Sequence, residues 1–419
     1  MGKSRRILPF VVATLPIQLN KYFFTDSSFV LGIPIDYLAI SIYLSDFAII
    51  LYLIIFVLDN YKKPQTLLAK SKNFLIPLLI LNIYFIANSI LTSKSPQTSA
   101  FSSLKFLEFS LFTLFASVDF SDKKTMAKIK MVATVTLLWQ SLLIVLQFLY
   151  QKSLGLWFLG ERSFDGTTPS IAQTNILERQ FLRPYGTFPH PNVLGACLVF
   201  FLIIISADLF KNNQEIAKLK RLSYQKIAVG LSLVACLLIY SKTALFILIL
   251  IPLIYSKNIK NIIIATVLII LVVVFYINFI SYSHITSIAE RLILTQAAYK
   301  IALINPLFGI GAGNFIAELA KLNLISISEV RLLQPVHNMF LLVIVENGIF
   351  GLILLANYLF AIQRKVASTQ KLILFLALML YFSVDHFLWT LQQGQFLFAI
   401  VSAYILSSPQ KTTITKTTA

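Results

Sequence analysis

Continuous apolar runs of about the length of a membrane span recur along the whole chain, and they restrict its fold more than any other feature. We predict twelve spans, at residues 7–20, 37–58, 73–91, 100–118, 128–150, 191–210, 224–240, 243–256, 261–281, 338–361, 371–390 and 394–408. Charged residues make up only 12% of the chain, about half of their share in soluble domains. The predicted fold is therefore an all-α, polytopic transmembrane helical bundle that forms one integral membrane domain over residues 1–419.

The positive charge of the chain is concentrated in the short connectors between these runs. The formal net charge is +18. If the N-terminus is cytoplasmic, the connectors and span ends on the cytoplasmic side hold 23 of the 35 Lys and Arg residues, as the positive-inside rule requires. We therefore predict that both termini are cytoplasmic. The expected partner of this basic chain is the lipid bilayer and not nucleic acid.

Two connectors on the non-cytoplasmic side, residues 151–190 and 282–337, are far longer than the others. Long connectors on a compact bundle are usually functional. Each holds four cations and three acids, so an anion site there must come from particular residues. The segment Ile285–Ile304 repeats apolar side chains at helical spacing, which predicts an amphipathic helix at the membrane interface and a second loop that is partly helical.

Several common kinds of site are not indicated by the sequence. The two cysteines, Cys197 and Cys236, both lie within apolar runs, so neither a disulfide framework nor a CxxC metal pair is expected. The sequence offers no paired outer carboxylates of glycosidase type, no Ser-His-Asp series and no metal-ligand cluster. We therefore expect no metal and no cofactor.

The first candidate motif is the stretch Arg183–Asn192, which directly precedes a span. Its three prolines and one glycine shape the backbone, so they hold Arg183 near the mouth of the bundle. A guanidinium there can bind a diphosphate with two parallel hydrogen bonds. The alternative is an interfacial arginine that binds lipid head groups. His190, between two prolines, is a candidate of lower rank.

The second candidate motif joins Glu290-Arg291 to the glycine-rich segment Pro306–Phe315. No strand–helix–strand pattern surrounds these glycines, so we reject a dinucleotide site. A tight turn before a short helix is predicted instead, with amides available to an anion. Arg291 is a second candidate ligand for a diphosphate, and the alternative is a salt bridge with a neighbouring acid or with lipid.

The third candidate is His337, which is followed by Asn338 at the end of the second long loop. A neutral histidine can accept a proton from a hydroxyl near pH 7, and the alternative is a residue that only ends a helix. Asp385 stands next to His386 late in the chain and is expected to orient an imidazole or to hold a cation. Lys242, in a short outer turn, adds a cation, or it only snorkels at a span end.

Charged residues within predicted spans are costly unless they are paired. Lys105 and Glu108 are three residues apart on one helix face, so we predict that they form an ion pair.

Together these motifs resemble the O-antigen ligase and O-antigen polymerase superfamily of bacterial membrane glycosyltransferases. The resemblance is strongest over residues 180–365, a core ligase-like region. The features that carry it are Arg-x-x-Gly-x-Phe-x-x-Pro-Asn at Arg183–Asn192, the Ser-Lys-Thr-Ala turn at Ser241–Ala244, Arg291 ahead of Pro306–Phe315, His337-Asn338 followed by Glu346–Gly351, and Asp385-His386.

The resemblance implies transfer of a glycan from an undecaprenyl-diphosphate donor to an acceptor hydroxyl, with inversion and without a metal. The acceptor would be a glycan or a lipid. The enzyme would lie in the bacterial cytoplasmic (inner) membrane, with its active site on the outer face, and would serve cell-surface polysaccharide or lipopolysaccharide synthesis.

The resemblance also implies roles for particular residues. Arg183, Lys242 and Arg291 would neutralise the diphosphate, although this family usually has Arg where Lys242 stands, and Lys lacks the planar fork. His337 would act with Arg291 in catalysis, as the base or as the group that orients the acceptor. The supporting residues would be Asp385, Asn338 and His190.

Two other function classes stay open on the sequence alone. A transporter of lipid-linked glycans would show inverted repeats and charges near the midplane of the membrane, whereas here the informative residues gather on the outer side. A scaffold for a polysaccharide assembly complex is the third reading. Within the superfamily, the sequence does not separate a ligase from a polymerase.

Overall fold

The computed structural model describes residues 2–62, 64–176, 179–209, 216–255, 282–322 and 331–407, and most of these residues are helical. The predicted span 261–281 lies outside them. The helices are α1 (Lys3–Ala13), α2 (Leu44–Asn60), α3 (Pro64–Leu91), α4 (Pro96–Asp119), α5 (Lys123–Tyr150), α6 (Pro191–Leu209), α7 (Ile216–Ile239), α8 (Lys242–Tyr255), α10 (Tyr282–Ala302), α11 (Phe315–Ala320), α12 (Met339–Gln363), α13 (Thr369–Val384), α14 (Phe387–Thr390) and α15 (Gln392–Leu406).

Four of the described helices are long and apolar enough to cross a membrane, judged by length and composition. They cover Phe74–Leu91, Pro96–Asp119, Lys123–Tyr150 and Met339–Gln363. Shorter apolar helices cover Pro191–Ser206, Ser223–Ile239, Lys242–Ile251 and Thr369–Val384. The helical, multi-pass character predicted from the sequence is confirmed, whereas the number of twelve spans stays a prediction.

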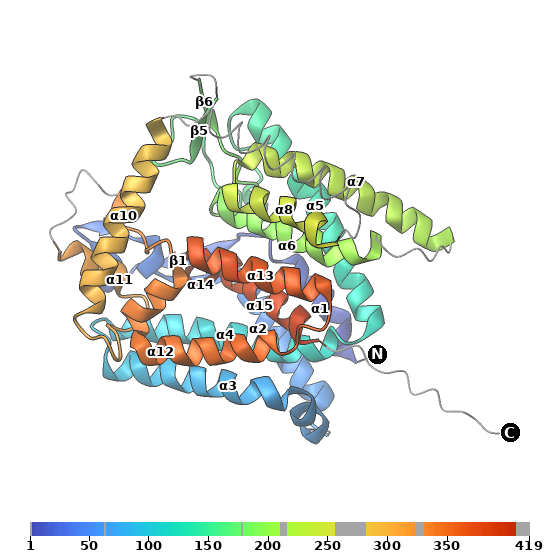
Figure 1. Cartoon of the computed structure of the whole chain (residues 1–419), viewed down its shortest axis with the longest axis horizontal. Helices are drawn as coiled ribbons and strands as arrows, with labels where there is room; N and C mark the ends of the chain where they lie inside the picture. The colour runs from blue at the N-terminus through green and yellow to red at the C-terminus, as the bar shows by residue number, and fades with distance from the viewer. Residues whose placement is uncertain are drawn as a thin grey trace.

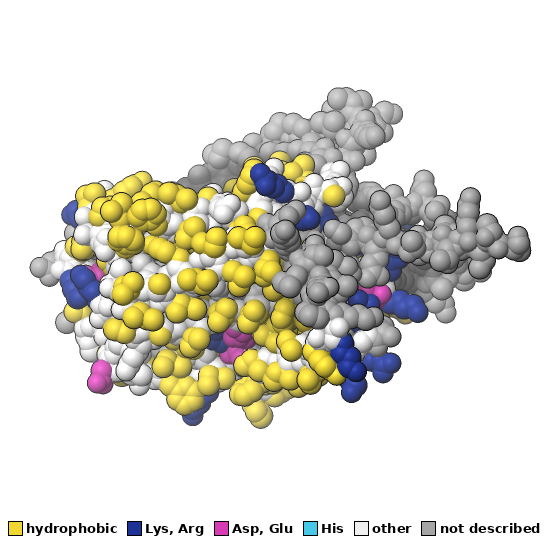
Figure 2. Space-filling model, turned by 90° about the horizontal axis from the view of Figure 1, so that it is seen from below, with side chains coloured by type: hydrophobic (Ala, Val, Ile, Leu, Met, Phe, Trp, Pro, Cys, Tyr) yellow, Lys and Arg dark blue, Asp and Glu magenta, His cyan; other side chains and the backbone are white. Residues whose placement is uncertain are grey.

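The outer surface of the bundle is apolar where lipid would cover it. Figure 2 shows one face of the molecule on which hydrophobic side chains dominate and charged side chains are few. Helix α3 exposes Ile83, Ile90 and Leu91 at 66%, 73% and 80% of their surface, respectively. In water such exposure would be costly, but it is what a lipid-facing helix requires.

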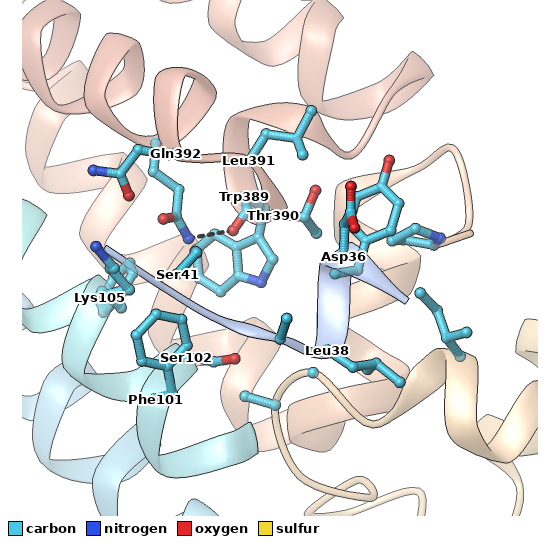
Figure 3. Close-up of a pocket in the computed structure, with 18 of the residues that line it drawn as sticks. Asp36, Leu38, Ser41, Phe101, Ser102, Lys105, Trp389, Thr390, Leu391 and Gln392 are labelled. Carbon is cyan, nitrogen blue, oxygen red and sulfur yellow. Dashed lines mark hydrogen bonds between the residues drawn. The ribbon is translucent and has the colours of Figure 1, made fainter. Parts of the chain in front are cut away.

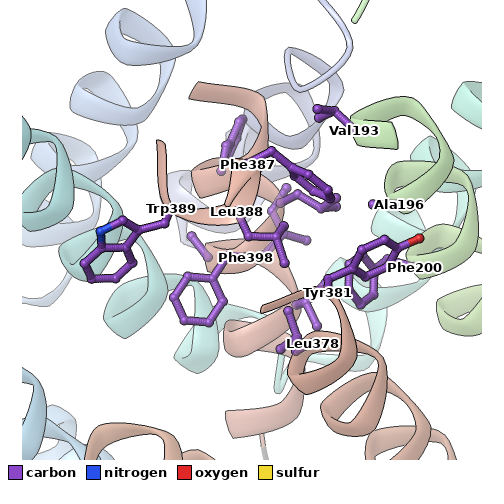
Figure 4. Close-up of a cluster of buried hydrophobic side chains, with 14 of the residues drawn as sticks. Val193, Ala196, Phe200, Leu378, Tyr381, Phe387, Leu388, Trp389 and Phe398 are labelled. Carbon is purple, nitrogen blue, oxygen red and sulfur yellow. The ribbon is translucent and has the colours of Figure 1, made fainter. Parts of the chain in front are cut away.

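The interior is formed around α6 and α15, whose side chains are buried over most of their described length. Helix α6 is surrounded by α5, α7, α8 and α13, and α15 lies against α4 (Figure 1). At their junction Phe200 packs at a tilted angle against Tyr381, and Phe387 packs edge-on against the same ring (Figure 4). This apolar cluster lies directly beside residues 385–386, so it gives the polar groups there a rigid base.

Contacts between the helix ends agree with the alternation of sides that the charge count predicts. At the predicted cytoplasmic end, Arg5 binds Asp119 with 3.0 Å between Nε and Oδ1, and the Ser4 amide donates to Asp59 over 2.7 Å. At the other end, the Gln18 amide donates to the Leu159 carbonyl over 3.0 Å. Segments predicted on one side of the membrane therefore do meet at one end of the bundle.

One predicted span begins too early. We predicted a span over 37–58, but α2 starts only at Leu44, and residues Ile40–Tyr43 form strand β4. This strand pairs antiparallel with β1 (Asn20–Phe23), so the predicted first span, 7–20, also ends at Ala13 as helix α1. A smaller pair, β2 (Phe29–Val30) and β3 (Ile33–Pro34), lies between them. The backbone of β4 forms its hydrogen bonds with β1, a strand about twenty residues earlier in the chain. Local hydropathy does not reveal this pairing.

A second predicted span, 371–390, is broken. Helix α13 ends at Val384, Asp385 has extended φ and ψ angles of −155° and 163°, and the short α14 starts at Phe387. The apolar run is continuous in sequence, but the Asp385 carboxylate accepts the amide of His386 over 2.8 Å and thereby replaces a helical hydrogen bond.

The two long outer loops both contain regular structure. The first holds a hairpin of β5 (Gln173–Ile176) and β6 (Arg179–Leu182). The second holds α10, at the place of the helix predicted over Ile285–Ile304, and then α11. The face of α10 differs from the prediction, because Ile301 is fully buried while Ile288 and Leu292 are each 57% exposed.

Candidate active site

Asp385 lies at the centre of the polar groups at the end of the bundle that carries the two long loops. Its Oδ1 is 3.4 Å from His337 Nδ1, and its Oδ2 accepts a hydrogen bond from Asn192 Nδ2 over 3.1 Å. Asp385 is buried, and its carboxylate faces the imidazole of His337, so it can orient that ring.

Asn338 fixes the position of His337 through the start of α12. Its side chain caps this helix by accepting the Leu341 amide over 2.9 Å, and its Nδ2 donates to the Ser383 carbonyl over 3.0 Å. A capping Asn satisfies an amide that the helix itself leaves unpaired. Since Ser383 lies in the last turn of α13, Asn338 ties the end of the second loop to the segment that carries Asp385.

Arg183 reaches the same carboxylate indirectly. Its Nε donates to the Ile239 carbonyl and its Nη2 donates to Asn192 Oδ1, both over 2.9 Å. Asn192 in turn donates to Asp385, so a line of hydrogen bonds runs from the end of α7 to the carboxylate. The arginine predicted as a diphosphate ligand thus uses part of its planar fork to position Asn192.

The stretch that carries Arg183 is held by a buried glutamine of α5. Gln147 Oε1 accepts the amides of Tyr185 and Gly186 over 3.0 and 2.8 Å, and Nε2 donates to the Gly186 carbonyl over 2.9 Å and to Glu161 over 2.8 Å. Gly186 has a φ of +55°, and a Cβ there would lie 2.2 Å from Gln140 Oε1. Only glycine therefore fits this turn.

His190 lies beside this network and not at its centre. Its Nδ1 accepts the backbone amide of Asn192 over 3.1 Å. Burial, followed by the positive charge of Arg183, lowers the pKa of His190 to about 3. The residue is therefore neutral at physiological pH, and it holds the turn into α6.

Arg291 and Lys242 supply positive charge on the α8 and α10 side of the cluster. Arg291 Nη1 donates to the Val384 carbonyl over 3.1 Å, immediately before Asp385. Lys242 opens α8, three residues after the carbonyl that binds Arg183, and the charges of Arg291 and Arg183 act on it. Arg183 binds Asn192, which binds Asp385, Arg291 binds the carbonyl before Asp385, and both charges act on Lys242; a shared diphosphate site for the three cations stays a prediction.

The glycine-rich segment forms the tight turn that we predicted before a short helix, but its amides bind within the protein. Gly309, Gly311 and Gly313 all have positive φ angles, of 74°, 91° and 75°. The amide of Gly311 donates to the backbone carbonyl of Glu346 over 2.8 Å, and the amide of Phe315 lies 3.5 Å from the Glu346 carboxylate. The turn thus faces the carboxyl group of Glu346 on α12.

The His337, Asp385 and His386 side chains form one compact cluster. Each offers one ligand atom, and these atoms lie within 4.8 Å of one another, so the set is able to hold a metal ion. The same groups also have partners in the protein. His386 Nδ1 is 2.7 Å from the Thr390 hydroxyl, and Asp385 binds Asn192 and the His386 amide.

The ion pair predicted within a span is present elsewhere in the bundle. Lys105 Nζ lies 3.6 Å from Glu108 and also binds Asp46, in the first turn of α2. Gln392, at the start of α15, donates to Asp46 as well. Lys105 and Gln392 line a cavity next to the cluster described above.

Sequence reasoning missed two members of the site. Asn192 ended the first motif without a role of its own, and His386 was only the neighbour of Asp385. Asn192 and Asp385 are separated by 193 positions in the chain, so no local signal links them.

Comparison with known proteins supports the resemblance. Residues 227–356, just under a third of the chain, match the family model described as O-antigen ligase. Lys242, Arg291, His337 and Asn338 lie inside this range, and Arg183 and Asp385 lie outside it. No curated protein matches the chain. The family indicates glycan transfer in a membrane during polysaccharide synthesis, with lipid-linked glycan substrates.

Proposed function

We propose that the protein transfers a glycan from undecaprenyl diphosphate to an acceptor hydroxyl, because residues 227–356 match the O-antigen ligase family model. The acceptor is a glycan or a lipid, and the reaction takes place on the outer face of the bacterial cytoplasmic membrane. The observation that carries this proposal is the 3.4 Å contact of His337 Nδ1 with the buried carboxylate of Asp385, next to three cations.

His337 has the geometry of a general base. Asp385 faces Nδ1, so it favours the tautomer with its proton on Nδ1 and leaves Nε2 to accept the proton of the acceptor hydroxyl. The oxygen of that hydroxyl attacks the anomeric carbon as the bond to the diphosphate breaks, which inverts that carbon. A carboxylate that orients an imidazole in this way also stabilises the imidazolium that forms.

The cations act on the leaving group. Negative charge grows on the diphosphate as its bond to the sugar breaks, and fixed positive charges at that point lower the barrier. Arg291 and Lys242 are proposed to contact the diphosphate, and Arg183 adds charge while it positions Asn192. Since these three charges match a diphosphate without a metal, we propose a metal-independent reaction.

The test uses purified protein with undecaprenyl-diphosphate glycan and a series of candidate acceptors, followed by identification of the product. We expect a glycosylated acceptor and free undecaprenyl diphosphate, with and without a chelator. His337→Ala and Arg291→Ala are expected to abolish transfer while the protein still inserts and elutes as a folded species. Normal transfer by both variants would falsify this mechanism.

Transport of the lipid-linked glycan is the second function to separate. In sealed vesicles, a transporter would move the donor across the bilayer and form no glycosyl product. The proposal predicts the opposite result, a glycosylated acceptor without movement of the donor across the bilayer.

A further inference from the structure

A cavity of about 240 Å³ opens next to the histidine cluster, and the proposed mechanism has not used it. Its walls come from the N-terminal strand segment, the start of α4, the glycine turn and the α14–α15 junction (Figure 3). Ligand pockets for drug-sized molecules usually have about 300–1,000 Å³. The cavity is therefore large enough for a sugar ring or two and not for an extended chain.

The lining combines aromatic rings with hydroxyls and amides. Trp389 lies at the centre of the aromatic part, with its ring centroid 5.1 Å from that of Phe106 and 5.5 Å from that of Phe85. The polar part includes Ser41, Ser102, Thr390, Gln392 and Gln395. Sugar rings present apolar C–H faces and a rim of hydroxyls, which match aromatic faces and side chains that both donate and accept.

The charges at the cavity cancel one another. Two cations, Lys105 and Arg162, and two carboxylates, Asp36 and Glu346, line it. Lys105 already binds Asp46 and Glu108, and Arg162 lies 3.4 Å from Asp36. A phosphate group would therefore meet no uncompensated charge here, and an alkyl chain would cover polar groups without pairing them. A neutral saccharide fits this balance.

The cavity adjoins the proposed catalytic cluster through residues that contact His386. Thr390 lines the cavity and lies 2.7 Å from His386 Nδ1. The ring of Tyr37, which also lines it, packs edge-on against His386 with 5.7 Å between centroids, and His386 lies 5.2 Å from His337 in the same measure. A hydroxyl of a sugar held in the cavity would thus be close to the imidazoles.

The cations lie on another side of this cluster. Among the described residues that line the cavity, Arg183, Lys242 and Arg291 are absent. They come from the loop before α6, from α8 and from α10, and of these elements only the loop before α6 also lines the cavity, through Pro189 and His190. Inversion requires the acceptor to attack from the side opposite the leaving group, and the histidines stand between the cavity and the cations.

We propose that this cavity is the acceptor subsite and that it binds a neutral sugar of an acceptor glycan. The assignment of the cavity to the acceptor rests on the proposed function, but the binding of a neutral saccharide does not. It assigns a binding role to the N-terminal strand segment, which lies far outside the residues that match the family.

A matched pair of variants on β4 tests the site. Ser41 faces the cavity, and the next residue, Ile42, is 41% exposed on the other face of the strand. Ser41→Phe fills the cavity without removing an aromatic ring or a charge. Ile42→Phe adds the same side chain to the same strand but leaves the cavity open.

The first measurement is binding, in the absence of donor and turnover. In full-length protein with Trp139→Phe and Trp157→Phe, Trp389 is the sole tryptophan. Its emission is followed while maltotriose, chitotriose and lactose are added, with glucose 6-phosphate as the anionic comparison. We expect a saturable change with at least one neutral saccharide, at least about tenfold weaker binding in Ser41→Phe, and a Kd within about twofold of the parent in Ile42→Phe.

The second measurement compares the KM values for the acceptor and for the donor in the transfer assay. Ser41→Phe should raise the KM for the acceptor by about tenfold or more and leave the KM for undecaprenyl-diphosphate glycan within about twofold. An absence of saturable binding by any neutral saccharide, or equal binding by both β4 variants, overturns the site. A rise in the donor KM alone overturns its assignment to the acceptor. If wild-type protein binds the saccharide and forms no product, the proposed function fails and the sugar site stands.

Discussion

The two long outer loops reach the same carboxylate by different means. The first loop is held from beneath, because the buried side chain of Gln147 binds its backbone at Tyr185 and Gly186. The second is held by its own backbone, because its glycine turn docks on carbonyls of α12. The first loop leads into α6, whose Asn192 binds Asp385, and the second loop ends at His337, which faces the same carboxylate.

This difference suggests separate tasks for the two loops. The backbone of the first loop is held by hydrogen bonds to a buried side chain of the bundle, Gln147, so we infer that the loop serves as a fixed frame for Asp385. The second loop contributes the partly exposed Arg291 and His337, which are able to contact substrate. This division predicts that substitutions in the first loop mainly lower stability and that substitutions in the second loop mainly lower the rate of transfer.

The largest effect is expected where the loops meet. Asp385→Asn keeps the size of the side chain but removes the charge that faces His337, so kcat for transfer should fall by about 10²–10⁴-fold. The measurement is the initial rate of product formation at saturating donor and acceptor. Asp165→Asn is a suitable control, since that carboxylate only binds Thr167 and Thr168 within an exposed turn of the first loop. A rate within about threefold of wild type would remove Asp385 from the mechanism.

The next largest effects are expected at the two arginines, Arg183 in the first loop and Arg291 in the second. Arg183→Lys keeps the charge but loses the fork that joins the Ile239 carbonyl to Asn192, so we expect a lower melting temperature and an activity loss of about tenfold. Arg291→Lys should leave the melting temperature unchanged and weaken binding of undecaprenyl diphosphate by a similar factor. Thermal unfolding in detergent and a donor-binding titration report the two quantities. The same pattern in both variants would contradict the division between frame and substrate contact.

A smaller effect on stability alone is expected at the glycine of the first loop. Gly186→Ala would place a Cβ 2.2 Å from Gln140 Oε1 in a backbone with φ of +55°, which should cost about 1–3 kcal/mol. Gly166→Ala in the same loop is the matched control, because its Cβ would meet no atom within 4 Å. Melting temperatures of the two variants should differ clearly. Equal values would show that the first loop is less rigid than its hydrogen bonds suggest.

The sequence predicted the helices well, because long apolar runs leave few alternatives in a bilayer. It failed where the backbone departs from a helix inside such a run. Residues 40–43 are apolar enough for a span, but they pair with β1. Asp385-His386 lies in a continuous apolar window, yet the side chain of Asp385 ends α13 by binding the next amide.

For the site, the sequence supplied the residue types and their order but not their contacts. The prolines and the glycine of the first motif correctly indicated a shaped turn before a span. That Arg183 binds the Ile239 carbonyl and that Asn192 binds Asp385 depends on how α6, α7 and α13 pack. The cavity next to the histidines was also invisible, because its walls come from segments spread over most of the chain.

The smallest predicted effect concerns His190 and the pH dependence of stability. Burial and the charge of Arg183 lower the pKa of His190 to about 3, from about 6.5 in the unfolded chain. The stability that the neutral imidazole contributes is therefore complete above about pH 6.5 and is lost as the pH falls towards 3. His190→Asn keeps an acceptor for the Asn192 amide but cannot be protonated, so its melting temperature should fall less steeply between pH 6.5 and pH 4.

Melting curves of wild type and His190→Asn over this pH range provide the test, and the two proteins should agree above pH 7. The acid limb of the transfer rate should be the same in both, since a neutral His190 takes no part in proton transfer. If both melting temperatures decline equally, protonation of His190 does not destabilise the folded protein. If the acid limb of the transfer rate moves in His190→Asn, protonation of His190 affects the reaction. The first loop would then contribute to catalysis, and the separation between a fixed frame and a reactive loop would no longer hold.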